Sequence, residues 1–93
     1  KHESSTVGIP GTRVKLVKVD PEIERSPAVG HPILGSIGRI SKRHTAPVGK
    51  TAVEFRGVRG KLKLLRGGWY DINKDDPITI YFRNDCLEVV EAS

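Results

Sequence analysis

The stretch "TAVEF", residues 51–55, alternates side chains with a period of two. Successive side chains of a β-strand point to opposite faces, so Val53 and Phe55 would face a core together. The same period runs through "ITIYFR", residues 78–83, where the isoleucines and the phenylalanine share one face. Both segments therefore predict strands that bury one face, and they set the expectation for the rest of the chain.

Strand-like patterns also occur on both sides of these two segments, at 12–19, 34–43, 61–65 and 87–91. In the first of them the alternation slips by one residue after Leu16, which predicts a β-bulge. We expect the inward positions of all six segments to supply the core, namely Val14, Leu16, Ile37, Ile40, Val53, Phe55, Leu62, Leu64, Ile80, Phe82, Leu87 and Val89.

The segment 20–33, "DPEIERSPAVGHPI", cannot be a central strand, because its three prolines each lack a backbone donor. One helical turn fits at Pro21–Arg25, and the remainder is predicted to be a long ordered loop. Loops of this length in compact domains often have a function.

The whole chain of 93 residues, with ten glycines and six prolines, favours one small domain of short strands. We predict an all-β fold, a small SH3-like barrel of five or six strands with a proline-rich loop (20–33) and a basic hairpin insertion (57–66). An OB-type barrel is disfavoured because it needs a helix between strands. Residues 1–9 are expected to form a flexible arm, and residues 10–93 the single domain.

Catalytic and metal-binding patterns are missing from the sequence. The histidines at 2, 31 and 44 are scattered, Cys86 is the single cysteine, and no zinc spacing, nucleophile elbow or phosphate-binding loop occurs. We therefore expect no enzyme activity, cofactor, metal or small-molecule substrate. A lone cysteine also fits a reducing compartment, and no apolar run is long enough for membrane insertion. Because the chain begins at Lys1, we expect a processed form or a fragment of a longer protein.

Charge is concentrated in the middle of the chain. Residues 39–66 carry nine cations with Glu54 as the single anion, whereas residues 67–93 carry two cations and six anions. A basic block of this kind either forms a solvated face or binds an anionic partner, and its concentration here favours the partner.

The most basic stretch, "RGVRGKLKLLRGGWYD" at 56–71, is predicted to be a β-hairpin arm. Leu62 and Leu64 would anchor it to the barrel. Trp69 either joins them, with Tyr70 pointing outward, or is exposed beside the basic face. Asp71, with Asp75 and Asp76, is expected to pair with part of the basic face. The residues that we expect to face a partner are Lys42, Arg43, Arg56, Arg59, Lys61, Lys63, Arg66 and Tyr70.

With the strands placed, the order of motifs resembles the SH3-like accessory subunits of photosynthetic electron transport. The closest likeness is to the subunit S family of the NADH dehydrogenase-like complex. The likeness rests on "PGTRVKLV" (10–17), "GSIGRI" (35–40), "GKTAVEF" (49–55), "GGWYD" (67–71), "ITIYFR" (78–83) and "CLEVV" (86–90). The chain departs from that pattern in its proline-rich loop, its basic hairpin and its "WY" pair.

This resemblance implies a non-catalytic docking or adaptor subunit that binds acidic ferredoxin as part of a larger complex. It further implies that Arg83, at the end of the I-T-F-R-like strand, contacts the partner. The compartment would be the plastid stroma or the cyanobacterial cytoplasm, and otherwise the cytoplasm.

A second resemblance leads to another class of partner. "GSIGRI" is similar to the turn and strand of KOW-type SH3-like barrels in ribosomal and transcription proteins. It implies a nucleic-acid-binding module that contacts an RNA or DNA backbone. Cations beside aromatic side chains suit nucleic acid and acidic protein equally well. A purely structural subunit of a large complex would bind neither.

Overall fold

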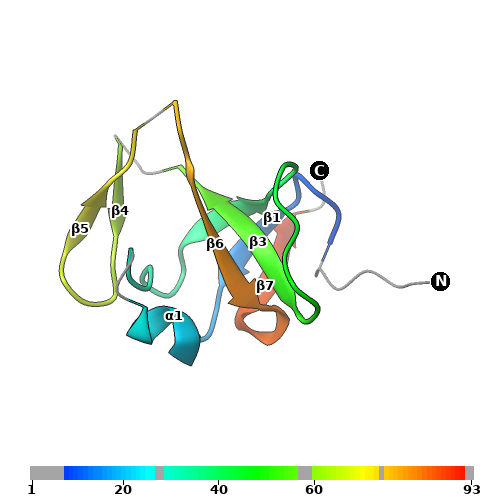
Figure 1. The fold of residues 1–93 in the computed structure, drawn as a ribbon, viewed down its shortest axis with the longest axis horizontal. Helices are drawn as coiled ribbons and strands as arrows, with labels where there is room; N and C mark the ends of the chain where they lie inside the picture. Colours follow the sequence, from blue (N-terminus) through cyan, green and yellow to red (C-terminus); the bar gives the residue numbers. More distant parts are fainter. Residues whose placement is uncertain (1–7, 27–28, 57–59, 74, 92–93) are drawn as a thin grey trace.

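The computed structural model describes residues 8–26, 29–56, 60–73 and 75–91 and contains two antiparallel β-sheets with one short α-helix (Figure 1). The all-β prediction is confirmed. The elements in chain order are β1 (Arg13–Leu16), α1 (Pro21–Arg25), β2 (Ile37–Ile40), β3 (Lys50–Phe55), β4 (Lys61–Lys63), β5 (Trp69–Asp71), β6 (Ile78–Arg83), the 3-10 helix η1 (Asn84–Cys86) and β7 (Leu87–Glu91).

The larger sheet has the strand order β6-β3-β2-β1-β7, and every neighbouring pair is antiparallel. β6 and β7 end this sheet, so it is open among the described residues and does not close on itself. The smaller sheet is the β4–β5 hairpin, which extends to one side of the larger sheet (Figure 1). Seven strands are described instead of the predicted five or six, because the "WYD" segment pairs with β4 as its return strand.

The core lies on one face of the larger sheet, where Val53, Phe55 and Phe82 are all buried as predicted. The two phenylalanine rings meet edge to face, with their centroids 5.9 Å apart. Eight other apolar side chains complete the buried cluster, namely Val14, Leu16, Ile40, Leu62, Ile72, Ile80, Cys86 and Leu87. Leu64 packs against this cluster and is partly buried.

Two predicted core residues are exposed. Ile37 is 50% exposed, because Ile40 lies three residues away and the two cannot share one face of a strand. The inward position between them belongs to Gly38, which is buried. Val89 is 43% exposed, because it lies on the edge strand β7, which has a neighbour on one side only.

The first strand is also shorter than predicted. It ends at Leu16, where the alternation slips, and Val17 donates its backbone N–H to the carbonyl of Cys86 at 2.8 Å. The slip after Leu16 therefore marks the end of the strand. The register shift occurs instead between Arg13 and Val14, where β1 pairs with β7.

The helical turn at Pro21–Arg25 is confirmed, and Asp20 caps it from a completely buried position. One carboxylate oxygen of Asp20 accepts from the N–H of Glu22 at 3.0 Å, and the other accepts from the N–H of Arg83 at 2.9 Å. The N–H of Asp20 donates to Nε2 of the buried His31 at 2.9 Å. Asp20 thus joins the helix, the end of β6 and the proline-rich loop.

The end of the proline-rich loop binds the hairpin. The N–H of Ile33 donates to the carbonyl of Lys63 at 3.1 Å, and the N–H of Leu65 donates to the carbonyl of His31 at 2.6 Å. Pro32 and Leu64 form an isolated antiparallel bridge between these bonds. The loop and the hairpin, predicted as separate insertions, therefore hold each other in place.

Gly38 provides a test of the packing between β2 and β3. A Cβ added there would lie 2.7 Å from the carbonyl oxygen of Glu54 and 2.7 Å from Cγ1 of Val53. We expect Gly38→Ala to lower the free energy of unfolding by about 1–3 kcal/mol, measured by urea denaturation. At Gly8 an added Cβ would have its nearest contact at 3.4 Å, so the control Gly8→Ala should change stability by less than about 0.5 kcal/mol. Equal stability of the two variants would contradict this packing.

Asp20 provides a second test. Replacing it with alanine removes the helix cap and leaves the N–H of Arg83 without its acceptor, so we expect a loss of about 2–4 kcal/mol in thermal or urea unfolding. Asp85 is the matched control, because its half-exposed carboxylate lies 3.5 Å from Lys18. Asp85→Ala should change stability by only about 0–1 kcal/mol. A small effect at Asp20 would show that the buried carboxylate does not hold the fold.

Candidate anion-binding groove

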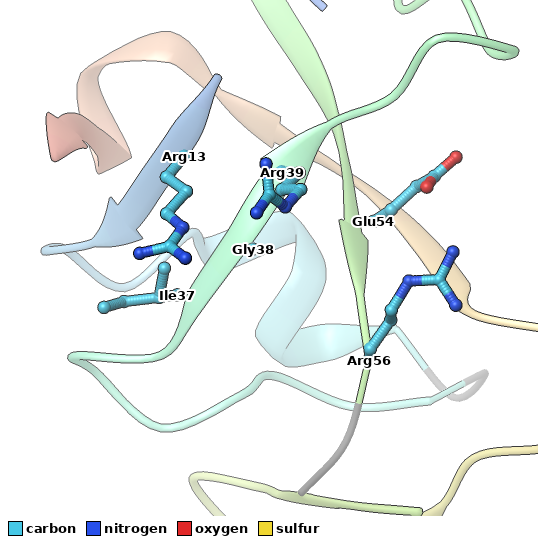
Figure 2. A pocket seen from close by; sticks show the side chains of 6 residues that line it. All are labelled: Arg13, Ile37, Gly38, Arg39, Glu54 and Arg56. Carbon is cyan, nitrogen blue, oxygen red and sulfur yellow. The ribbon is translucent and has the colours of Figure 1, made fainter. Parts of the chain in front are cut away.

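Three arginines project from the solvent face of the larger sheet: Arg13 from β1, Arg39 from β2, and Arg56 just after the end of β3. Alternation sends Arg13, Arg39 and Arg56 outward, because the residues next to them along the chain, Val14, Gly38 and Phe55 among them, are buried. Figure 2 shows these arginines around one hollow, which has a volume of about 160 Å³. The other residues that line it are Ile37, Gly38 and Glu54.

Cross-strand pairing determines how these charges meet. Arg13 lies directly opposite Arg39 in the β1–β2 register, and Arg39 lies opposite Glu54 in the β2–β3 register. Arg39 donates to the carbonyl of Gly11 at 3.2 Å, while Glu54 accepts from the hydroxyl of Ser41 at 3.1 Å. Glu91 lies opposite Arg13 on its other side, in the β1–β7 register, so Arg13 and Arg39 each have one glutamate and one arginine as cross-strand neighbours. The described lining of the hollow itself carries three guanidinium groups and one carboxylate.

Two further hollows adjoin the first at Arg56, which lines all three. One, of about 230 Å³, adds Lys42 and Arg43. The other, of about 380 Å³, lies between the hairpin and the sheet and adds Lys61 and Lys63. We call the three together the cationic groove, whose basic residues are Arg13, Arg39, Lys42, Arg43, Arg56, Lys61 and Lys63. Glu54 is the only carboxylate among the described residues that line it.

The groove unites a majority of the predicted partner-facing residues and adds two that sequence reasoning missed. The predicted residues that it brings together are Lys42, Arg43, Arg56, Lys61 and Lys63. The missed ones are Arg13 and Arg39. The sequence alone could indicate that both side chains point outward, because each precedes a predicted core residue, Val14 or Ile40. What no local pattern shows is that β1 and β2 pair and so bring the two arginines together.

The other predicted cations lie elsewhere. Arg66 pairs with Glu24 of α1 at 3.0 Å, and Arg83 approaches Asp85 at 3.7 Å, so neither lines the groove. Arg59 falls in residues 57–59, outside the described part of the chain. The pairing predicted for Asp71 is confirmed, since its carboxylate lies 2.9 Å from Nζ of Lys61.

The two adjacent aromatics have the opposite orientation from the one in which Trp69 anchors the hairpin. Trp69 is 59% exposed, and the Nζ of Lys63 lies 5.7 Å from its ring centroid. Tyr70 is half-buried and packs against the core, because it pairs with the buried Leu62 and shares its face. The predicted orientation with Trp69 buried as an anchor and Tyr70 pointing outward is therefore wrong, whereas the prediction of Tyr70 as a partner contact stays a prediction.

Tyr70 instead lines a separate hollow of about 550 Å³. Its lining includes His44 and the carboxylates of Asp71 and Asp76, and no lysine or arginine among the described residues. The described lining of this hollow is thus acidic, and its Asp71 pairs with Lys61 of the cationic groove.

Metal-binding and thiol chemistry have little support in the described residues. Within them, no three His, Cys, Asp or Glu side chains lie close enough together to hold a metal ion. Cys86 is buried, and its burial raises the pKa of the thiol, with the carboxylates of Asp20 and Asp85 raising it further. The described part of the chain contains no helix of the length and hydropathy that a membrane crossing requires.

The burial of Cys86 predicts that its thiol reacts slowly in the folded protein. Thiolates are the reactive form, so Cys86 in the folded protein should react with iodoacetamide far more slowly at pH 8 than in urea. Burial raises the pKa of the Cys86 thiol in the folded state above its pKa in the unfolded chain. The neutral thiol therefore contributes to the stability of the folded state below the unfolded pKa. This contribution is lost as the pH rises through the folded pKa. Mass spectrometry of timed samples measures the rate. Equal rates in buffer and urea would contradict the burial of the thiol.

Comparisons of the chain with protein-family models, with curated proteins and with solved structures gave no significant match. The resemblance to photosynthetic accessory subunits and the KOW-type likeness therefore stay predictions, and the cationic groove carries the functional argument.

Proposed function

We propose that this protein is a non-catalytic docking module that binds an acidic protein through the cationic groove. The observation that carries the proposal is the gathering of seven lysines and arginines around adjoining hollows whose described lining contains one carboxylate. Such a field attracts an acidic partner over a distance and orients it before contact.

The register of the arginines supports a binding role, because Arg13 and Arg39 lie directly opposite each other on neighbouring strands. A partner carboxylate placed between them would accept from both guanidinium groups, and charge-assisted bonds of this kind are about twice as strong as neutral ones. The groove is therefore best complemented by clustered Asp and Glu side chains.

We further propose that the fold is an SH3-like barrel. An SH3-like barrel is supported by the antiparallel order of the larger sheet, in which the last strand returns beside the first. The implied partner is then a small acidic electron carrier such as ferredoxin. The contact that we propose for it is the groove and not Arg83, which lies beside Asp85.

A second candidate function, binding of single-stranded nucleic acid, is favoured by one observation. The indole of Trp69 is exposed at the hairpin end of the groove, with Lys63 beside it. An exposed aromatic ring stacks on a base while nearby cations contact phosphates. One such ring serves one base, whereas a stacking platform uses several, so we rank this function second.

The test is a charge reversal with a matched control. Lys61→Glu with Lys63→Glu should lower the affinity for ferredoxin about tenfold, mostly through a slower and less salt-sensitive on-rate. Lys18→Glu with Arg25→Glu changes net charge equally but lies outside the groove, so it should change affinity less than about twofold. Calorimetry and stopped-flow mixing at several salt concentrations measure both.

The same titrations, made with oligo(dT) and duplex DNA, separate the candidates. Tight binding of oligo(dT) with a steep salt dependence and no ferredoxin binding would establish the second candidate and reject the first. Binding of neither acidic protein nor nucleic acid would reject both. Equal losses in the groove variant and its control would show that net charge, and not the groove, governs binding.

A further inference from the structure

The hollow between the hairpin and the sheet differs in chemistry from the rest of the cationic groove. Its surface is mostly apolar and comes from Ile33, Ile37, Leu62 and Trp69. Ile37 and Trp69 are among the most exposed large apolar side chains of the described residues. Exposed apolar groups gathered in one hollow mark a place where a partner buries surface.

Cations line the same hollow as these apolar side chains. Arg56, Lys61 and Lys63 line the same hollow, and Arg56 connects it to the arginine-lined hollow of Figure 2. An apolar centre within a polar border is the usual arrangement of a protein interface. Here the border is basic, so the groups beside the buried part of the partner must be acidic.

The walls of the hollow are preformed. Backbone hydrogen bonds tie β4 to residues 31–33, and the Lys63 ammonium lies over the Trp69 ring. The opposite wall is the larger sheet, where Ile37 belongs to β2 and Arg56 follows β3. A site that is ordered before binding loses little entropy when the partner arrives. Its volume of about 380 Å³ lies within the roughly 300–1,000 Å³ of small-molecule pockets, so the hollow has room for one large side chain.

We infer that the partner presents an acidic segment with one large apolar side chain, which inserts between the hairpin and the sheet against Trp69 and Ile37. The flanking carboxylates of the segment contact Arg56, Lys61 and Lys63 and continue toward Arg13 and Arg39. This inference rests on the proposed function and specifies the chemistry of its partner: charge brings the segment to the groove, and the apolar side chain holds it there.

Three fluorescein-labelled peptides of equal length test the inference. The first is rich in Glu and Asp with one central Phe, the second replaces that Phe with Ser, and the third keeps the Phe but replaces every acid with Gln. Fluorescence anisotropy should show the first binding about ten- to a hundredfold more tightly than the second, as expected for a buried aromatic anchor. The third should bind weakest, because it lacks the charges.

Variants of the full chain locate the effect. Trp69→Ala and Ile37→Ser should each remove most of the difference in affinity between the first two peptides. The affinity for the second peptide, which keeps its acids but lacks the Phe, should stay nearly unchanged. Tyr81→Ala is the matched control, since this exposed aromatic of β6 does not line the groove. Both groove positions are solvent-exposed, and circular dichroism checks that each variant keeps its fold.

The outcomes distinguish this inference from the function on which it rests. If the first two peptides bind equally and Trp69→Ala changes neither, the apolar hollow is not an anchor site, although acidic docking stands. If no acidic peptide and no acidic protein binds, the proposed function fails as well. If oligo(dT) binds more tightly than any peptide and loses affinity in Trp69→Ala, the hollow receives a base, and the inference is overturned.

Discussion

The completely buried carboxylate of Asp20 is the contact on which the rest of this structure depends. It accepts hydrogen bonds from the backbone of Glu22 and Arg83, while its own N–H donates to His31. A buried carboxylate is unfavourable unless it is fully hydrogen-bonded, so these three segments cannot separate without a large penalty. In a domain this small, where the apolar core is thin, such a polar centre supplies order that hydrophobic packing alone does not.

The candidate site depends on the same centre through a short chain of contacts. His31, held by Asp20, begins the segment whose backbone bonds to β4, and β4 carries Lys61 and Lys63. One wall of the cationic groove is thus positioned through a buried hydrogen bond between residues that do not line the groove. The second wall needs no such support, because Arg39 and its neighbours are fixed by the ladder of the larger sheet.

Sequence periodicity predicted which face of its own strand a side chain occupies. It did not predict the contacts that depend on how two strands pair. Val53 and Phe55 could be placed in the core because alternation within a strand determines which face a side chain occupies. The orientation of Trp69 could not be predicted, since it depends on which residue of β5 pairs with Leu62. For the same reason, only part of the groove could be predicted. Its hairpin lysines are close in sequence, whereas Arg13 and Arg39 become neighbours through β1–β2 pairing.

The hairpin enters the fold between β3 and β6, two strands that already pair with each other along six residues. The β3–β6 ladder fixes the register of the larger sheet, while Leu62 and the backbone bonds to residues 31–33 fix the hairpin, so it is the outward-facing residues of the hairpin that can change. The larger sheet would then be the constant part of the binding site and the hairpin its variable part. Evolution could retune the ligand preference of such a scaffold by altering a single connection, and a designer could graft new specificities onto it in the same way.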